Sequence, residues 1–77
     1  MKIEVLGTGC AKCNKLYEAT KEAIAAAGVD AELVKVEKIM DIAARGVLVT
    51  PALTVDGEVK FSGKVPKVEE LVKAITG

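Results

Sequence analysis

The 77-residue sequence has no histidine and no tryptophan, and it holds one tyrosine, one phenylalanine and two cysteines. A structural zinc site takes four ligands, mostly cysteine and histidine. One copy of this chain therefore cannot build such a site, although a dimer could share one. Single-stranded nucleic acid is usually bound on aromatic side chains, which are nearly missing here. Eleven basic residues are balanced by eleven acidic ones, so no basic excess exists to bind phosphate and we expect no nucleic-acid partner.

Long apolar runs are also missing from the sequence. No run approaches the roughly 18 apolar residues of a membrane span, so we expect no membrane insertion. Met1 and Lys2 lead into a short apolar stretch without a signal-peptide cleavage pattern, which predicts a cytoplasmic protein. The length predicts a single domain over residues 1–77, which we expect to be a monomer. In a reducing cytosol a cysteine pair is more often catalytic or metal-binding than structural.

A strand, a helix and a second strand are expected in the first half of the chain. Residues 3–6 are apolar or β-branched apart from one acid and end at Gly7, which is typical of a strand. From Ala11 to Ala27 apolar residues recur every three or four positions, which predicts an amphipathic helix closed by Gly28. Residues 31–36 form the second expected strand. This succession predicts two parallel strands joined by a right-handed crossover.

The second half of the sequence predicts a short helix, two strands and a final helix. The short helix begins at Ile39 and stops at Arg45-Gly46, and the third strand is Ala52–Val55. Asp56-Gly57 is a strong hairpin signal that leads to a fourth strand at residues 59–61. Pro66 is expected to start the last helix, whose apolar residues have helical spacing. The order βαβαββα predicts an α/β fold: a four-stranded mixed sheet, the first strand inside it and helices on both faces.

Both cysteines lie in one stretch, Gly-Thr-Gly-Cys-Ala-Lys-Cys, which follows the first expected strand. Because Cys10 and Cys13 are three residues apart at a helix start, they share one face of the first turn and can bond to each other or to a metal. Unpaired N–H groups and the positive end of the helix dipole favour a thiolate there. Gly9 allows the tight turn into the helix. Thiol–disulfide chemistry and binding of a soft metal such as Cu(I) are both possible for this pair.

The element order, the Cys-x-x-Cys motif and the Thr-Pro before the third strand resemble the thioredoxin/glutaredoxin superfamily over the whole chain. The nearest likeness is to the very small archaeal-type thioredoxin-like redox-active disulfide proteins with a Gly-Thr-Gly-Cys-x-x-Cys start. The resemblance implies a thioredoxin-like fold, with Cys10 as the nucleophile and Cys13 as the resolving thiol of a mixed-disulfide mechanism. It also implies that Pro51 follows a cis peptide bond, faces the disulfide and positions substrate together with Thr50. Gly63 would form a turn beside this site.

Two further residues are candidates for tuning the cysteines. Lys12 lies between them and adds positive charge near the thiolate. Glu4 lies six residues before Cys10, the spacing at which thioredoxins place a buried carboxylate that relays the proton of the resolving thiol. Such an acid on an inner strand would have a raised pKa. The alternative is that Glu4 points to solvent at an edge of the sheet.

The resemblance implies protein disulfides as substrates, a thiol or a reductase as the electron donor, and no cofactor beyond the Cys10–Cys13 disulfide. Ala11-Lys12 replaces both the Gly-Pro of thioredoxins and the Tyr of glutaredoxins between the cysteines, so we do not expect glutathione binding. Two other functions stay open. One is a copper-binding or copper-transfer module, a class with the order βαββαβ and a terminal strand. The other is a redox-sensing interaction domain without turnover.

Overall fold

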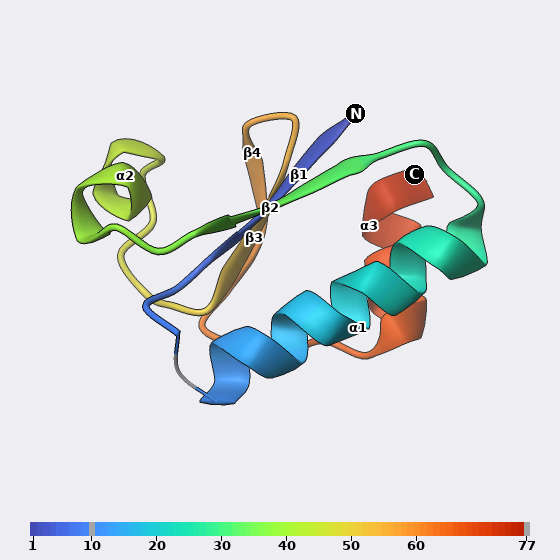
Figure 1. Ribbon diagram of the computed structural model, residues 1–77, viewed down its shortest axis with the longest axis horizontal. Coiled ribbons are helices and arrows are strands. Elements are labelled where there is room, and N and C mark those ends of the chain that lie inside the picture. The colour runs from blue at the N-terminus through green and yellow to red at the C-terminus, as the bar shows by residue number, and fades with distance from the viewer. Residues whose placement is uncertain (10, 77) are drawn as a thin grey trace.

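The computed structural model describes residues 1–9 and 11–76, and within them three helices enclose one four-stranded sheet (Figure 1). The order βαβαββα is confirmed. The elements are β1 (Lys2–Leu6), α1 (Ala11–Ala27), β2 (Glu32–Val36), α2 (Ile39–Ala44), β3 (Ala52–Val55), β4 (Glu58–Ser62) and α3 (Val68–Thr76).

The sheet is mixed and has the strand order β2-β1-β3-β4. β1 pairs parallel with β2, and α1 forms the crossover between them. β1 pairs antiparallel with β3, where Leu6 lies opposite Ala52. β3 and β4 form a hairpin around Asp56-Gly57, both with positive φ (50° and 87°), the backbone that this dipeptide favours. The chain therefore keeps β1 in the interior of the sheet, as the sequence predicts.

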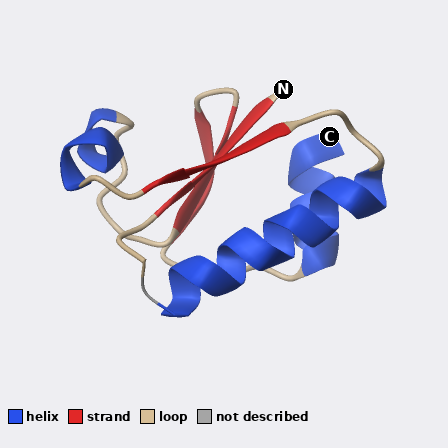
Figure 2. Cartoon of the chain, viewed as in Figure 1, coloured by secondary structure: helices blue, strands red, loops and turns tan. Residues whose placement is uncertain are grey.

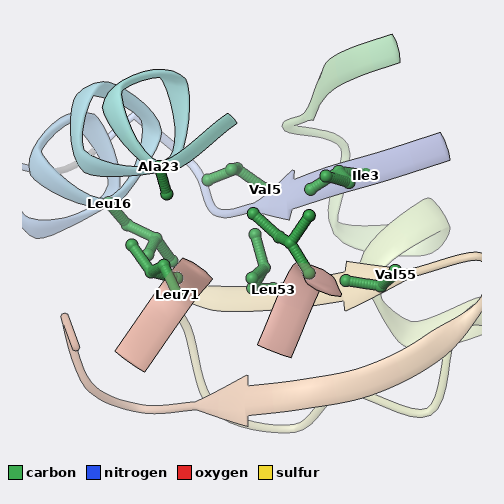
Figure 3. Packing of buried hydrophobic residues seen from close by; sticks show 8 residues of the cluster. Ile3, Val5, Leu16, Ala23, Leu53, Val55 and Leu71 are labelled. Atoms are coloured by element: carbon green, nitrogen blue, oxygen red, sulfur yellow. The ribbon is translucent and has the colours of Figure 1, made fainter. Parts of the chain in front are cut away.

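Helices cover both faces of the sheet, with α1 and α3 on one side and α2 on the other (Figures 1 and 2). Because side chains alternate along a strand, Ile3 and Val5 point to α1 and α3, where they pack with Leu16, Leu53 and Leu71 (Figure 3). Leu6 points the other way, into a smaller cluster under α2. That cluster holds Leu6, Val36, Ile42, Val47 and Ala52.

Several element ends differ from the sequence prediction. The last helix begins at Val68 and not at Pro66. Lys67 precedes its first turn: the carbonyl of Lys67 accepts the first helical bond from Leu71, and its N–H donates to the Glu70 side chain at 3.3 Å. That reach of a glutamate back to the residue before a helix is half of a capping box. β4 extends one residue beyond the predicted strand at each end.

Candidate functional site

Gly7 and Cys13 bring the end of β1 against the start of α1. The Gly7 N–H donates to the Val36 carbonyl at 2.9 Å, which extends the pairing of β1 with β2. Cys13 is 5% exposed, on the face of α1 that packs on the sheet. A Cβ built at Gly7 would overlap the Cys13 sulfur and lie 2.9 Å from its Cβ. Gly7 thus provides the space that the buried sulfur occupies, since carbon atoms in contact normally lie about 3.5–4.0 Å apart.

A small cavity opens beside Cys13. Its volume is about 10 Å³, close to the roughly 10–15 Å³ that one water molecule needs. Lys35 and Glu37, from β2 and the residue after it, line the cavity together with Gly7 and Gly9. A Cβ at Gly9 would lie 3.5 Å from Glu37 Oε2, and Gly9 has a φ of +89° that a residue with a side chain rarely adopts. Charged side chains therefore reach the rim of the site from the strand side.

Thr50 and Pro51 lie at the same end of the sheet as Gly7. Leu6 pairs with Ala52, so the residue after Leu6 and the residue before Ala52 are neighbours across two adjacent strands. The Thr50–Pro51 peptide bond is cis, as the resemblance implies. Pro51 is fully buried, whereas Thr50 is exposed. Thr50 lines a groove of about 380 Å³ that also touches Thr8, in the turn between β1 and α1.

Gly63 contacts the loop that carries Thr50 and Pro51, called the proline loop below. The Gly63 N–H donates to the Pro51 carbonyl at 2.8 Å. Its φ is +76°, and a Cβ there would lie 2.9 Å from Val49 Cγ1. A glycine is therefore needed at this position both for its backbone conformation and for the close approach of the loop. Leu48 and Val49 precede Thr50 in the chain, and their apolar side chains are 94% and 55% exposed.

Glu4 is buried, but away from Cys13. It lies on the α2 face of β1, the face of Leu6, whereas Cys13 lies on the face of Ile3 and Val5. Both oxygens of Glu4 accept bonds from Arg45 at 2.8 Å, and Thr54 Oγ1 donates to Oε1 at 3.1 Å.

These bonds set the charge state of Glu4. The Arg45 guanidinium is the main cause that holds the pKa of Glu4 below its ordinary value. Burial acts in the opposite direction, and Thr54 adds to the lowering. The bond to Glu4 in turn raises the pKa of Arg45. The raised pKa expected of a relay acid is therefore wrong for Glu4, and so is the alternative of a solvent-facing side chain.

The remaining predicted residues divide into those near the site and those not described. Cys10 lies outside the described residues. Lys12 is exposed on the first turn of α1, next in sequence to Cys13. Among residues 1–9 and 11–76, no three side chains of the His, Cys, Asp and Glu types lie close enough to hold a metal. In the same part of the chain, no helix is long and apolar enough to cross a membrane.

Sequence reasoning missed three residues that shape this site. Gly7 was read as the end of a strand and the first residue of the Gly-Thr-Gly-Cys motif, but its role in accommodating the Cys13 sulfur was not foreseen. Glu37 was not singled out, because nothing local marks the residue after a strand as facing a distant turn. Arg45 was assigned only to a helix end. A signal for Arg45 did exist, because a carboxylate on an inner strand needs a cation partner when buried.

Comparison with known proteins gives the family of this chain. Residues 1–76 match the thioredoxin domain family. A thioredoxin of Methanocaldococcus jannaschii is 48% identical over 69 residues, which are 90% of this chain and 79% of that protein. A thioredoxin of Methanothermobacter thermautotrophicus is 41% identical over 76 residues, which are 99% of each chain. The fold, the site and these relatives agree: the chain belongs to the thioredoxin domain family.

Proposed function

We propose that the protein is a small thiol–disulfide oxidoreductase that cycles Cys10 and Cys13 between a dithiol and a disulfide. Membership of the thioredoxin domain family and two thioredoxins that are 41% and 48% identical support this activity. The observation that carries the proposal is the buried Cys13 sulfur against Gly7, at the same end of the sheet as the cis Thr50–Pro51 bond. A sulfur held there can act only on a partner brought to this end of the sheet.

The proposed cycle moves two electrons. The Cys10 thiolate attacks one sulfur of a substrate disulfide, the substrate S–S bond breaks, and one substrate thiolate leaves. Cys13 then loses its proton to water, and its thiolate attacks Cys10 in the mixed disulfide. The second substrate thiolate leaves, and a Cys10–Cys13 disulfide remains. A dithiol donor restores both thiols by the same exchange in reverse. Lys12 places a positive charge on the first turn of α1, where it stabilises the attacking thiolate.

The substrate is a protein disulfide, which meets the chain beside Thr50 and Pro51. The exposed apolar side chains of Leu48 and Val49 flank this position. They can pack against apolar residues that surround a solvent-accessible disulfide of the substrate. Gly9 and Gly63 provide the positive-φ backbone of the two turns beside the site. The proposal includes no bound cofactor, a thiol or reductase as the electron donor, a single monomeric domain and a cytoplasmic location.

Trapping tests the assignment of the two cysteines. The Cys13→Ser variant, reduced beforehand, should accumulate a mixed disulfide with a disulfide-bonded test protein such as insulin, because nothing resolves the bond to Cys10. Cys10→Ser is the matched control and should form little adduct, since Cys13 is buried. Mass spectrometry under non-reducing conditions counts both species. Equal trapping by the two variants, or none by either, would contradict the proposed roles.

A redox titration separates this function from copper binding. The wild-type chain, equilibrated in thiol/disulfide buffers and quenched with an alkylating agent, should pass from two free thiols to none in a single two-electron step. A pair that never forms the intramolecular disulfide would refute the oxidoreductase. The copper module is further disfavoured by the element order, in which α2 lies between β2 and β3, since that class has the order βαββαβ.

A further inference from the structure

Segment 39–50, which runs from α2 to Thr50, carries several exposed apolar side chains. Ile39, Met40 and Leu48 are 72%, 84% and 94% exposed. Ile39 and Leu48 line the groove that also touches Thr8 and Thr50, so this apolar surface continues to the turn that leads into the Cys-x-x-Cys motif. A protein disulfide that reaches the site through this groove contacts the segment first.

The segment has few contacts that hold it in place. α2 is six residues long, and Ile42 is its single buried residue. No side chain caps its N-terminus at Lys38, and Gly46 follows its end with a φ of +75°. Helices this short are not stable alone, so their position depends on tertiary contacts. Here those contacts are the small cluster around Ile42 and Val47 and the side chain of Arg45.

Arg45 joins the end of α2 to the two central strands. Its Nε and Nη2 donate to the two oxygens of Glu4, both at 2.8 Å, and its Nη1 donates to the Asp41 carbonyl at 3.0 Å within α2. Glu4 lies on β1, directly opposite Thr54 of β3, which donates to the same carboxylate. A guanidinium that binds a carboxylate through two parallel bonds fixes orientation as well as distance. β3 starts immediately after Pro51, so this fork ties α2 to the strand that carries the proline loop.

We propose that Arg45 and Glu4 are positioning residues that hold segment 39–50 against the sheet and thereby set the affinity for protein disulfides. The proposal rests on the oxidoreductase function proposed above and adds to it a determinant of substrate binding. The pair lies on the sheet face opposite Cys13, so its loss moves the docking segment without touching the sulfur chemistry. A protein disulfide should therefore feel the loss, and a small disulfide that needs no docking should not.

The experiment compares two substrates. Each reduced variant is assayed for kcat and KM with insulin, with dithiothreitol as the electron donor. Its rate with 5,5′-dithiobis(2-nitrobenzoate) is measured in a single turnover after excess reductant has been removed, because dithiothreitol reduces this small disulfide directly. For Arg45→Gln we expect KM for insulin to rise roughly tenfold, as for a loss of one contact at a docking surface. The kcat for insulin and the small-disulfide rate should stay within about twofold of the wild type, as for a loss of uniform binding.

Three further variants separate a positioning role from general destabilisation. Lys38→Gln removes a positive charge from the residue before α2 and should leave KM unchanged. Arg45→Lys keeps the charge but loses the fork, and it should raise KM less than Arg45→Gln. The double variant Glu4→Gln/Arg45→Gln removes both charges of the pair and so leaves no buried charge unpaired at this position, which keeps the test valid if Arg45→Gln fails to fold. Its KM should match that of Arg45→Gln, since either change breaks the same pair.

The outcomes distinguish a failure of the positioning role from a failure of the oxidoreductase function. A parallel fall of both rates in a folded variant would overturn the positioning role, and so would an unchanged KM for insulin. Hydrogen exchange adds a readout at the segment itself: the amides of Ile42 and Gly46 should exchange faster in the double variant, while those of β1 should not. If the wild type reduces neither disulfide, the oxidoreductase function itself fails. A wild type that reduces both, with KM insensitive to Arg45, refutes the positioning role alone.

Discussion

The contact between Gly7 and Cys13 gives the sharpest prediction, because one methyl group tests it. No positive φ marks Gly7, so an alanine fits the backbone and meets only the Cys13 side chain. That methyl would overlap the sulfur and lie 2.9 Å from the Cys13 Cβ, so the start of α1 must move away from β1. Overpacking a buried site costs about 2 kcal/mol. Alanine also lowers the conformational entropy of the unfolded chain, which stabilises the folded state by about 0.7 kcal/mol.

We therefore expect Gly7→Ala to lower the free energy of unfolding by about 1 kcal/mol. For a domain of this size that corresponds to a melting temperature about 4–8 °C lower. Circular dichroism at 222 nm, in the presence and absence of dithiothreitol, measures the shift. In the Cys13→Ala background the overlap with the sulfur is gone and only the contact with the Cβ at residue 13 remains, so the same substitution at Gly7 should cost less.

Gly57→Ala is the matched control. Gly57 has a φ of +87° and no atom near its missing Cβ, so its substitution costs about 1 kcal/mol through the backbone alone. That cost should be the same with and without the Cys13 sulfur. If Gly7→Ala melts within about 1 °C of the wild type, or if its cost is unchanged in the Cys13→Ala background, the packing of the sulfur against Gly7 is refuted.

Three further changes test the Glu4–Arg45 ion pair, the core and the loop that carries Pro51. Because Arg45 lowers the pKa of Glu4 in the folded state, the contribution of Glu4 to stability is complete above the ordinary pKa of a glutamate. It is lost as pH falls through the lowered pKa, so the stability gap between wild type and Glu4→Gln should close below about pH 4 in urea titrations. Leu71→Ala empties the space between α3 and the sheet and should cost about 3 kcal/mol in the same titrations. Gly63→Ala forces a side chain at φ +76° against Val49 and should cost more than about 1 kcal/mol.

The last of these has its own control. Gly46 has nearly the same φ, +75°, but nothing lies near its missing Cβ. Gly46→Ala therefore reports the backbone cost by itself. A Gly63→Ala variant that is no less stable than Gly46→Ala would show that Gly63 is required for its conformation and not for the approach of Val49.

The order of the elements could be predicted from the sequence because local patterns decide it. The apolar spacing from Ala11 to Ala27 and the glycine after it marked α1 to the residue, since both signals act within a few turns of helix. Asp56-Gly57 marked the hairpin for the same reason. The β-α-β succession then left the right-handed parallel crossover.

The surroundings of the site depended on contacts between distant parts of the chain. The alternating strand pattern places the side chains of Glu4 and Val5 on opposite faces of the sheet. It does not say which helix covers which face, so it could not identify Arg45 as the partner of Glu4. Equally, Val47 and Leu48 are both apolar neighbours, yet one is buried and the other is 94% exposed.

The sequence by itself thus determined the element order and the place of the Cys-x-x-Cys motif after β1 in the chain, with Cys13 on α1. Patterns only a few residues long specify both that strand and that helix. The tertiary structure decided that Gly7 accommodates the sulfur and that Gly63 supports Pro51. It also decided that Glu4 binds Arg45 at the end of α2 and does not contact Cys13. The physical reason is that burial and pairing belong to two segments at once, and no single segment carries the information about what will cover it.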